Sequence, residues 1–550
     1  MANDNSATVS TLATKRIMGN DADNFDAVIV GAGFAGMYML HNLVNLGVKV
    51  LAIEEASEVG GTWYWNRYPG ARCDVESIEY SYSFSEEIQQ GWEWTDRYSK
   101  QPEILAYANH VADKLSLRPF IKFDTRVVAA KYNESSRVWS ITTDEGRIYF
   151  ARYFIMATGT LSSINQPRFE GLNSYKGNWY ITGRWPRTEV DFSGKRVGII
   201  GTGSSAVQAI PVIAKQAKHL TVFQRTPNYS IPAENKPLDP HEVANIKANY
   251  SQIRAKAKEN RAGIAMMEVG TKRALETSQE EREKEYARRW RAGGTGFTAA
   301  YTDIMEKEAA NETAAEFVRD QIRRSVHNSV TAEMLSPKNA IGCKRLCADT
   351  DYYITYNRDN VTLIDVNKTP IKRLVSTGLK TSERIFHLDA IIFAMGFDAM
   401  TGAILAVDIR GKSGELLKDK WIHGPQTYLG LSCNGFPNMF TITGPGSPSV
   451  LSNMMTSIEQ HVEWITECIK FMTSSGKTEI EANLMAQDEW MDHVEEVANK
   501  TLRYSCNSWY VGANIPGKKR VFLPYAGGLP AYSEKCLQVA SAHYQGFSVR

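Results

Sequence analysis

Two strand–glycine–helix patterns constrain this chain more than any other feature of its sequence. The first starts at Asp26 as DAVIVGAGFAGMYMLHNLVNLGVKVLAIEE, where an apolar stretch meets three glycines, a helical stretch and a second strand. The second starts at Lys195 as KRVGIIGTGSSAVQAIPVIAKQAKHLTVFQ and repeats that order. A strand, a crossover helix and a parallel strand within about 30 residues form one βαβ unit. Two such units predict an α/β fold with two Rossmann-like dinucleotide-binding domains.

Length and composition limit the number of domains and the class of protein. The chain has 550 residues, enough for about three or four domains. Hydrophobic residues make up 43% and charged residues 23%, an ordinary globular mixture. Lys+Arg 63 against Asp+Glu 61 gives a net charge of +2, so we expect no nucleic-acid or membrane partner. The polar N-terminus and the lack of an apolar run of about 20 residues predict a cytoplasmic protein. We expect a monomer or weak homo-oligomer.

The first glycine motif is Gly31-Ala-Gly33-Phe-Ala-Gly36, between a strand and a helix. Gly31 permits the tight turn, Gly33 lets a pyrophosphate approach the backbone, and Gly36 lets helix and strand pack closely. The helix N-terminus then offers unpaired N–H groups to the phosphates. Glu54 ends the second strand, where a carboxylate binds both ribose hydroxyls and repels a 2′-phosphate. This pattern predicts FAD or NAD rather than NADP.

The second motif is Gly201-Thr-Gly203-Ser-Ser-Ala206, with alanine in the permitted third position. Its second strand ends in Gln224-Arg225-Thr226, which contains no acid. Arg225 is placed to pair with the 2′-phosphate that separates NADPH from NADH, although a surface arginine on a turn is the alternative. Two sites with opposite ribose preferences predict a flavin that receives hydride from NADPH.

The rest of the chain suggests how these domains are arranged. Strand-like alternation runs from Arg126 to Met156, and a matching strand AIIFAMGFD begins at Ala390. From about His241 to Arg324 the composition predicts a helical insertion, whose charge run EEREKEYARRWR we expect to be a solvated face. The expected boundaries are a disordered tail at 1–24, FAD-binding segments at 25–167 and 388–550, NADP-binding segments at 168–228 and 332–387, and a helical insertion at 229–331.

The cysteines are odd in number and scattered, at Cys73, Cys343, Cys347, Cys433, Cys468, Cys506 and Cys536. This distribution favours free thiols in a reducing compartment over a disulfide framework. Cys343 and Cys347 have no second Cys or His pair beside them, so we expect a structural role and no metal site.

Several further motifs resemble those of the Baeyer–Villiger monooxygenases, over nearly everything from Phe25 to the C-terminus. They are Gly60-Gly-Thr-Trp63-Tyr-Trp65-Asn-Arg67-Tyr-Pro69-Gly-Ala-Arg72-Cys-Asp74, Gly342-Cys-Lys344-Arg345 followed by Asp351-Tyr-Tyr, Asn357-Arg-Asp-Asn360, and Ser508-Trp509-Tyr-Val-Gly-Ala-Asn514. In the loop from Gly444 to Met454 the chain is more similar to the phenylacetone and steroid monooxygenase branch than to cyclohexanone monooxygenase.

One segment departs from the family pattern FxGxxxHxxxW. In register, Tyr175 replaces the leading Phe, Gly177 and Trp185 match, and Ile181 stands where the family has His. The resemblance implies that this segment joins the two nucleotide domains without touching substrate. The departure therefore predicts weaker coupling of NADPH use to product formation, with more hydrogen peroxide released, rather than a different reaction.

The resemblance also implies residue roles. Arg345 is expected to stabilise a flavin C4a-peroxide and its Criegee adduct with a ketone, and Asp74 to position Arg345, although a structural ion pair is the alternative. Lys344 resembles a second contact to the 2′-phosphate, and Trp509 a loop residue that folds over the nicotinamide, unless it only packs. Tyr80 and Met454 match pocket positions but suit a core equally. The remaining cofactor-binding residues that we expect are Gly61, Thr62, Trp63, Thr202, Ser204, Ser205, Gln208 and Thr226.

The sequence thus predicts an enzyme that uses FAD, NADPH and O₂ to convert ketones into esters or lactones. An N- or S-oxygenating flavin monooxygenase is the first alternative, but such enzymes lack the context of Lys344 and Arg345. A poorly coupled NADPH oxidase, or an NADPH-binding sensor without turnover, is the second, and only Ile181 favours it.

Overall fold

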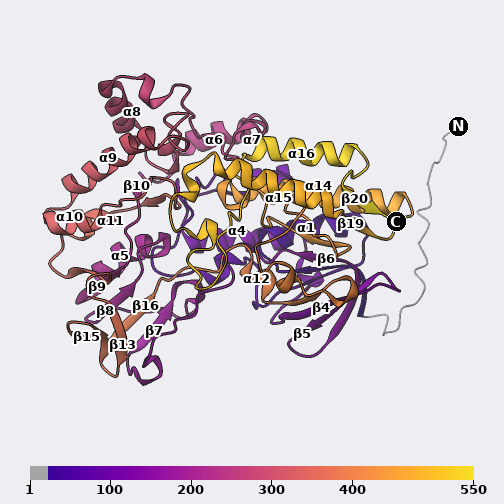
Figure 1. Ribbon diagram of the computed structural model, residues 1–550, viewed down its shortest axis with the longest axis horizontal. Coiled ribbons are helices and arrows are strands. Elements are labelled where there is room, and N and C mark those ends of the chain that lie inside the picture. The colour runs from indigo at the N-terminus through magenta and orange to yellow at the C-terminus, as the bar shows by residue number, and fades with distance from the viewer. Residues whose placement is uncertain (1–22) are drawn as a thin grey trace.

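A computed structural model describes residues 23–550 (Figure 1). The expected tail at 1–24 lies outside the described residues except for its last two positions, and Asn24 already begins strand β1 (Asn24–Val30). Figure 1 shows two sheets towards opposite ends of the long axis, with a group of helices above the sheet on the left.

The sheet on the right contains both ends of the first βαβ unit. It has eight strands in the order β17-β4-β5-β6-β1-β2-β3, with β18 added against β6. β1 pairs in parallel with β2 and β6, so Val28 lies opposite Leu51 and Phe154. Its apolar run is buried because both faces of the central strands are covered. The other strands are β2 (Val50–Ile53), β3 (Ile121–Lys122), β4 (Val127–Asn133), β5 (Val138–Thr143), β6 (Ile148–Met156), β17 (Asp408–Arg410) and β18 (Met439–Thr441).

Helix α1 (Phe34–Asn45) crosses from β1 to β2 and packs against α14 (Met454–Ser474). Asn42 Nδ2 donates to Thr466 Oγ1 at 3.2 Å across this contact. The remaining elements of this half are α2 (Thr62–Trp65), α3 (Glu86–Gly91), α4 (Gln101–Lys114), α12 (Gly402–Leu405), α13 (Leu417–Lys420), α15 (Leu484–Asn499), α16 (Leu529–Ser541), β19 (Ile480–Ala482) and β20 (Phe547–Val549). Within residues 23–550, no helix is both long enough and apolar enough to cross a membrane.

The sheet on the left contains the second βαβ unit. It has five parallel strands in the order β12-β9-β8-β16-β7. Helix α5 (Ser204–Gln216) follows β8 and buries its apolar face. The strands are β7 (Asn178–Ile181), β8 (Arg196–Ile200), β9 (His219–Gln224), β12 (Val361–Asp365) and β16 (Ala390–Phe393), beside the short helix α11 (Tyr352–Thr355) and an antiparallel meander of β13 (Ile371–Val375), β14 (Gly378–Thr381) and β15 (Ile385–His387).

The position of β16 corrects one expected boundary. We expected the strand at Ala390 to return the chain to the first domain near Leu388, but β16 pairs with β8 and β7 in the second sheet. The chain rejoins the first sheet only later, where β17 pairs with β4 and β18 with β6. A short, wholly apolar strand suits the centre of any parallel sheet, so its sequence does not specify which sheet it joins.

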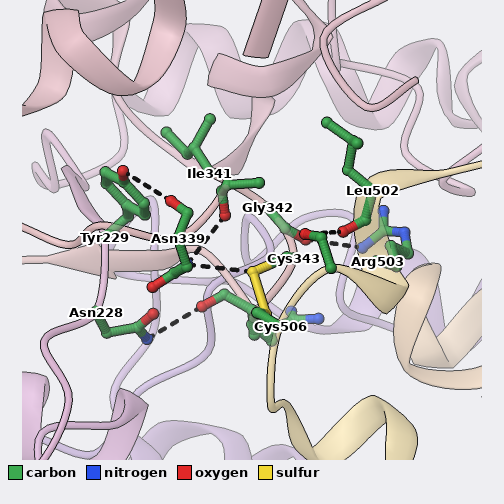
Figure 2. Close-up of a disulfide and its surroundings, with 12 residues drawn as sticks. Asn228, Tyr229, Asn339, Ile341, Gly342, Cys343, Leu502, Arg503 and Cys506 are labelled. Carbon is green, nitrogen blue, oxygen red and sulfur yellow. Dashed lines mark hydrogen bonds between the residues drawn. A yellow bond between two sulfur atoms is a disulfide. The ribbon is translucent and has the colours of Figure 1, made fainter. Parts of the chain in front are cut away.

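The expectation that all cysteines are free thiols is wrong for two of the seven. Cys343 and Cys506 form a disulfide between residues 163 positions apart in the chain, shown in Figure 2. The sequence gives no sign of it, because the partners are far apart and only the fold brings them together. The other five cysteines are buried and free.

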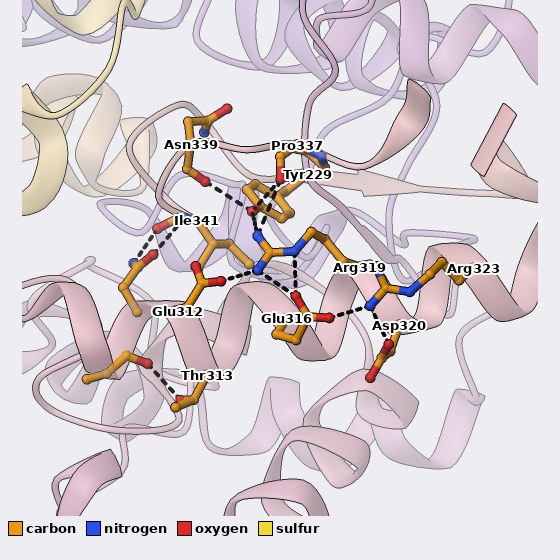
Figure 3. Close-up of polar contacts among 12 residues, drawn as sticks. Tyr229, Glu312, Thr313, Glu316, Arg319, Asp320, Arg323, Pro337, Asn339 and Ile341 are labelled. Carbon is orange, nitrogen blue, oxygen red and sulfur yellow. Dashed lines mark hydrogen bonds and ion pairs between the residues drawn. The ribbon is translucent and has the colours of Figure 1, made fainter. Parts of the chain in front are cut away.

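The helical insertion rises above the second sheet (Figure 1). It consists of α6 (Pro240–Ala248), α7 (Tyr250–Glu259), α8 (Gln279–Ala292), α9 (Glu308–Ser325) and α10 (Ser329–Leu335). At its base, β10 (Ser230–Pro232) pairs with β11 (Cys347–Asp349). Figure 3 shows how α9 attaches to this base: Arg319 pairs with Glu312 and Glu316 and donates from Nη1 to the Tyr229 hydroxyl at 3.1 Å.

The charge run on α8 is solvated on only one side. Glu280 and Lys284 are exposed, as expected. Arg289, however, is only 6% exposed, and its Nε donates to Glu285 at 2.7 Å. Tyr286 is buried beside it. A buried arginine needs such partners, because an unpaired charge away from water is costly.

Candidate active site

The three glycines of the first motif have separate structural roles. Gly31 has φ of +106°, and an added Cβ would lie 2.6 Å from the Ala157 carbonyl oxygen. At Gly36 an added Cβ would lie 1.9 Å from the Gly31 carbonyl oxygen, so only glycine allows α1 to pack this closely. At Gly33 the nearest atom to an added Cβ is Gly61 Cα, at 3.4 Å. The start of α1 carries no side-chain cap, so its free N–H groups suit a pyrophosphate.

Glu54 lies beside this turn, with its carboxylate held by backbone amides. Ala32 N donates to Oε2 at 2.6 Å and Ala56 N to Oε1 at 2.8 Å. Burial raises the pKa of Glu54 above its ordinary value, and the two amide bonds oppose that rise. A carboxylate fixed at the end of the second strand fits the ribose hydroxyls of a dinucleotide.

The second motif repeats this geometry at the start of α5. Gly201 has φ of +115°, and an added Cβ would lie 2.3 Å from the Ala394 carbonyl oxygen. At Gly203 an added Cβ meets no described atom within 4 Å, so the backbone there borders open space. Thr202 Oγ1 donates to the Thr226 carbonyl at 2.8 Å and holds the turn against the end of β9. The uncapped start of α5 suits a second pyrophosphate.

Two cations lie together near this turn. Burial lowers the pKa of Lys344, and the positive charge of Arg225 lowers it further. Within residues 23–550 neither forms an ion pair with a carboxylate. Arg225 is exposed and follows β9 directly. Two cations without an acidic partner suit a dianionic phosphate.

Other expected cofactor residues on α5 make contacts within the protein. Gln208 accepts from the Tyr68 hydroxyl at 2.8 Å and donates to the Arg72 carbonyl at 3.0 Å. Ser204 Oγ lies 3.2 Å from Cys347 Sγ, and Ser205 interacts with Tyr68. Gln208 therefore joins α5 to the loop of the first domain, a role that its position in the sequence does not reveal.

Arg345 and Asp74 form a bidentate ion pair between segments far apart in the chain. Arg345 Nε and Nη2 donate to the two carboxylate oxygens of Asp74 at 2.9 and 2.7 Å. Nη1 donates to the Val450 carbonyl at 2.8 Å. Asp74 raises the pKa of Arg345, burial opposes this, and the guanidinium remains charged. Planar, bidentate pairing fixes the orientation of this cation.

The loop that carries Asp74 begins at Gly60 and continues through α2. Thr62 is the first residue of α2, and Trp63 Nε1 donates to the Tyr80 hydroxyl at 3.1 Å. Tyr80 also packs edge-on against Phe34 at the start of α1, with ring centroids 6.0 Å apart. Trp63 and Tyr80 therefore link this loop to the first glycine turn. Met454, the first residue of α14, packs against both the first-domain core and the C-terminal segment.

Trp509 lies on a short 3₁₀ helix, η10 (Trp509–Val511), and its ring centroid is 4.3 Å from that of Tyr510. Two buried polar atoms of the same segment, Ser508 Oγ and Asn514 Oδ1, have no hydrogen-bond partner among the described residues. Unpartnered buried oxygens suit a ligand that brings donors. Sequence reasoning missed Arg503, which donates from Nη1 to the Gly342 carbonyl at 3.2 Å and has no charged partner in the described chain.

A cleft of about 130 Å³ opens beside Asp74. Its opposite wall comes from the helical insertion, through Ile264, Met267 and Phe297. The helical pattern of the insertion carries no chemical motif, so it did not predict any part for the insertion in the site. In the folded chain, apolar side chains of the insertion line the same cleft as Asp74, the carboxylate that binds Arg345.

Ile181 ends β7, opposite Phe393 of β16. It is 8% exposed and packs in an apolar cluster of the second domain with Leu388 and Phe393. Four residues later, Trp185 N donates to the Trp65 carbonyl at 3.4 Å, a contact with the first-domain loop. Ile181 thus packs at the end of a strand that leads directly into the junction between the domains.

Comparisons with known proteins agree with this architecture. Residues 28–328 match the family described as pyridine nucleotide-disulphide oxidoreductase. A solved structure entitled oxidized steroid monooxygenase bound to NADP superposes with a TM-score of 0.92 at 48% identity, over 96% of this chain and 99% of that chain. The likeness confirms the predicted α/β fold with two dinucleotide-binding domains.

Characterised relatives are similar over almost their whole length. A Baeyer-Villiger monooxygenase of Pseudooceanicola batsensis is 43% identical over 95% of this chain and 95% of that protein. A phenazine N-monooxygenase of Lysobacter antibioticus is 41% identical over 96% of this chain and 97% of that protein.

Two nucleotide turns and a fixed cation in one chain are typical of an oxidoreductase that brings a flavin and a pyridine nucleotide together. The chain belongs to the Baeyer–Villiger monooxygenase family, whose cofactors are FAD and NADPH. The identity to the steroid monooxygenase agrees with the branch that the sequence predicts.

Proposed function

We propose that this enzyme uses NADPH and O₂ to insert one oxygen atom into ketones, giving esters or lactones. The observation that carries this proposal is the Arg345 guanidinium, held by Asp74, whose carboxylate lines the cleft. When the carbonyl carbon of a ketone is attacked, its oxygen gains negative charge that a fixed cation stabilises. Arg345 remains charged at any working pH and supplies that cation. FAD, when bound, supplies the chemistry that accepts hydride and activates O₂.

The cofactor roles of individual residues are part of the proposal. FAD would lie on the turn of Gly31 and Gly33, with its ribose at Glu54. NADP would lie on the turn at Gly203, with its 2′-phosphate between Arg225 and Lys344. Three observations support this: an added Cβ at Gly33 would be accommodated at 3.4 Å, the backbone at Gly203 borders open space, and neither cation has a carboxylate partner among the described residues. The FAD-binding segments would then be 25–167 and the chain after β16, and the NADP-binding segments 168–228 and 332 to the end of β16.

The cleft beside Asp74 supplies the substrate side of the proposal. Ile264, Met267 and Phe297 line it with apolar surface, which favours ketones with an apolar body. Charged residues of the same cleft pair with one another, Arg97 with Glu76 and Arg288 with Glu268.

The test uses labelled oxygen. The purified protein is incubated with NADPH, ¹⁸O₂ and a panel of linear, cyclic, aromatic and steroidal ketones, and the products are analysed by mass spectrometry. We expect an ester or lactone that contains one ¹⁸O atom, with NADPH consumption that rises when the ketone is added. Unlabelled product, or NADPH consumption without any ester from the whole panel, would contradict the proposal.

N-oxygenation is a second candidate, because the phenazine N-monooxygenase is as similar to this chain as the ketone-oxidising relatives are. A nitrogen heterocycle has no carbonyl oxygen to stabilise, so N-oxide formation would depend less on Arg345. Phenazines added to the same panel distinguish the two, since an N-oxide in the absence of any ester would favour the second candidate.

The cellular location, partners and oligomeric state of the enzyme are also part of the proposal. The five buried free cysteines and the small net charge favour a cytoplasmic enzyme that acts on small molecules, without a nucleic-acid or membrane partner. We propose a monomer or weak homo-oligomer, and light scattering of the purified protein measures its mass directly.

A further inference from the structure

The Cys343–Cys506 disulfide joins two segments of the candidate active site (Figure 2). Cys343 directly precedes Lys344 and Arg345, and Cys506 lies shortly before Trp509. The two Cα atoms are 6.1 Å apart. The bridge therefore ties the segment with the Arg345 cation to the segment with Trp509.

The two sulfur atoms have different surroundings. Cys343 is fully buried, whereas Cys506 is only half-buried. Asn339 Nδ2 donates to Cys343 Sγ at 3.1 Å, and this bond is drawn in Figure 2. Thiol–disulfide exchange is fastest where the attacked sulfur is accessible and the leaving sulfur is stabilised as a thiolate. Cys506 is therefore the sulfur open to attack, and Cys343 the better leaving group.

Two cations near the bridge in the sequence also favour formation of a thiolate when the disulfide opens. Lys344 follows Cys343, and Arg503, three positions before Cys506, donates to the Gly342 carbonyl at 3.2 Å. Neither cation has a carboxylate partner among the described residues. Neighbouring cations stabilise a thiolate over a thiol.

We propose that this disulfide is a thiol–disulfide exchange site for low-molecular-weight thiols, and that its redox state sets how firmly the segment 501–514 is held against the Arg345 segment. A thiolate attacks Cys506 Sγ, the sulfur–sulfur bond breaks, and Cys343 leaves as a thiolate beside Asn339. A second small thiolate attacks the sulfur of the first in the mixed disulfide, and Cys506 leaves as a thiolate. Two small thiols are thereby oxidised to one disulfide, and the protein gains two electrons and, on protonation, two protons.

Oxidation closes the cycle with hydrogen peroxide as the oxidant. Two protein thiols and one peroxide molecule give the protein disulfide and two water molecules. Reduction loosens the segment without detaching it, because Leu502 N still donates to the Met305 carbonyl at 2.8 Å and Asn514 Nδ2 to the Phe397 carbonyl at 2.7 Å.

The primary test does not depend on the enzymatic reaction. Native full-length protein is treated with glutathione or left oxidised, free thiols are alkylated, and peptides are mapped by mass spectrometry. Hydrogen exchange is then measured across residues 501–514. We expect a linked Cys343–Cys506 peptide before treatment, both thiols after it, and exchange at least about tenfold faster in the reduced protein.

Two variants serve as matched controls. In Cys506→Ser, residues 501–514 should show hydrogen exchange as fast as in the reduced protein, with no further change when glutathione is added. Asn507→Ser alters the exposed neighbour and should behave as the parent. Absence of the linked peptide, resistance to glutathione under native conditions, or equal exchange in both redox states would overturn the proposal.

The effect on catalysis rests on the proposed function. The KM for NADPH should rise by about threefold to tenfold on reduction and in Cys506→Ser, because Trp509 is held less firmly. Suppose that hydrogen exchange changes as expected but NADPH reduces no form of the FAD-loaded protein. The proposed function then fails, while the thiol–disulfide exchange site stands. If hydrogen exchange changes and the KM for NADPH does not, the disulfide has no influence on the active site and the regulatory part of the proposal is wrong.

Discussion

At the scale of single residues, the site depends on charges whose partners lie on distant segments. Both Asp74 and the Val450 carbonyl orient Arg345, so the guanidinium plane is set before any substrate arrives. Arg225 and Lys344 differ from this pair, because the charge of Arg225 lowers the pKa of Lys344 and neither has an acidic partner among the described residues. The first arrangement suits charge that develops during a reaction, and the second suits a ligand that is already charged.

Replacing Arg345 separates cofactor reduction from oxygen insertion. We expect Arg345→Ala to bind FAD and to be bleached by NADPH, because hydride transfer requires only apposed rings. Ester formation should fall by about 10²–10³, the usual cost of losing one electrostatic group at a reaction centre. Stopped-flow absorbance measures the bleaching and chromatography the ester. Arg345→Lys, which keeps the charge without the bidentate pair, should lose less, and ester formation near the parental rate in Arg345→Ala would rule out this role.

Replacing Arg225 tests the preference for NADPH. Arg225→Ala removes one charge-assisted contact, worth about 1.5–3 kcal/mol, and should raise the KM for NADPH by about 10–150-fold. The KM for NADH should change little, because NADH has no 2′-phosphate. Steady-state kinetics with both nucleotides measures the ratio, and Arg373→Ala, an exposed arginine elsewhere in the same half, is the control. An equal loss for both nucleotides would contradict the assignment.

At the scale of elements, each nucleotide turn combines a strand end, a glycine turn and an uncapped helix start. Within one turn the glycines are not equivalent. Gly36 and Gly201 are required because a Cβ would meet backbone oxygen, at 1.9 and 2.3 Å respectively. Gly33 and Gly203 border space that no described atom fills closely. We therefore expect one kind of glycine to be needed for folding and the other for the ligand.

Paired alanine substitutions in the first turn separate these two roles. Gly33→Ala should fold with a melting temperature near that of the parent apoprotein, because its Cβ is accommodated at 3.4 Å, but should lose most of its FAD. Gly36→Ala should be destabilised by about 1–3 kcal/mol or more, since helix and strand must move apart. Thermal melts of the apoproteins and the ratio of flavin to protein absorbance give both readouts. Similar melting temperatures for the two variants would show that the packing argument is wrong.

At the scale of the whole molecule, reaction requires the two nucleotide halves to remain in register. Several described contacts cross between segments at this junction. Gln208 binds the loop at Tyr68 and Arg72, Trp185 N donates to Trp65, and the disulfide ties the Arg345 segment to the C-terminal segment. Each contact is local, and we expect them together to influence where NADP would lie relative to the flavin.

The bridge at Gln208 is expected to matter for hydride transfer. Gln208→Leu keeps the size of the side chain but leaves the Tyr68 hydroxyl and the Arg72 carbonyl without their partner, at a cost of about 1–3 kcal/mol. We expect FAD content to be unchanged and the rate of flavin reduction by NADPH to fall. Gln208→Glu, which still accepts from Tyr68, should retain more of the rate. An unchanged rate in the leucine variant would indicate that this bridge does not orient the domains.

Ile181 offers a test of coupling at the same junction. We expect Ile181→His to release less hydrogen peroxide per NADPH, because a ring with N–H donors at the end of β7 would fix the segment that leads to Trp185. The apolar surroundings of Ile181 make the exchange costly, about 1–3 kcal/mol, so the melting temperature should drop. Peroxide and ester are measured side by side with one ketone. The same peroxide-to-ester ratio in both proteins would show that Ile181 is a neutral packing residue.

Local chemistry was sufficient to predict the two nucleotide turns, the carboxylate of Glu54, the cation of Arg225 and the helical nature of the insertion. Each depends on residues within one βαβ unit or one helix, where spacing and side-chain type act through short-range sterics and hydrogen bonding. The pairing of Arg345 with Asp74 also came from the sequence, but through family resemblance rather than from spacing.

Long-range packing decided the remaining features. β16 joins the second sheet, Gln208 faces the first-domain loop, and Cys506 meets Cys343 only because the folded chain brings distant segments together. An apolar strand, an amide and a thiol each suit several partners equally well, so their own sequence context carries no information about which one they meet. The same holds for the wall that the insertion gives to the cleft at Met267 and Phe297, which exists only once the tertiary structure has formed.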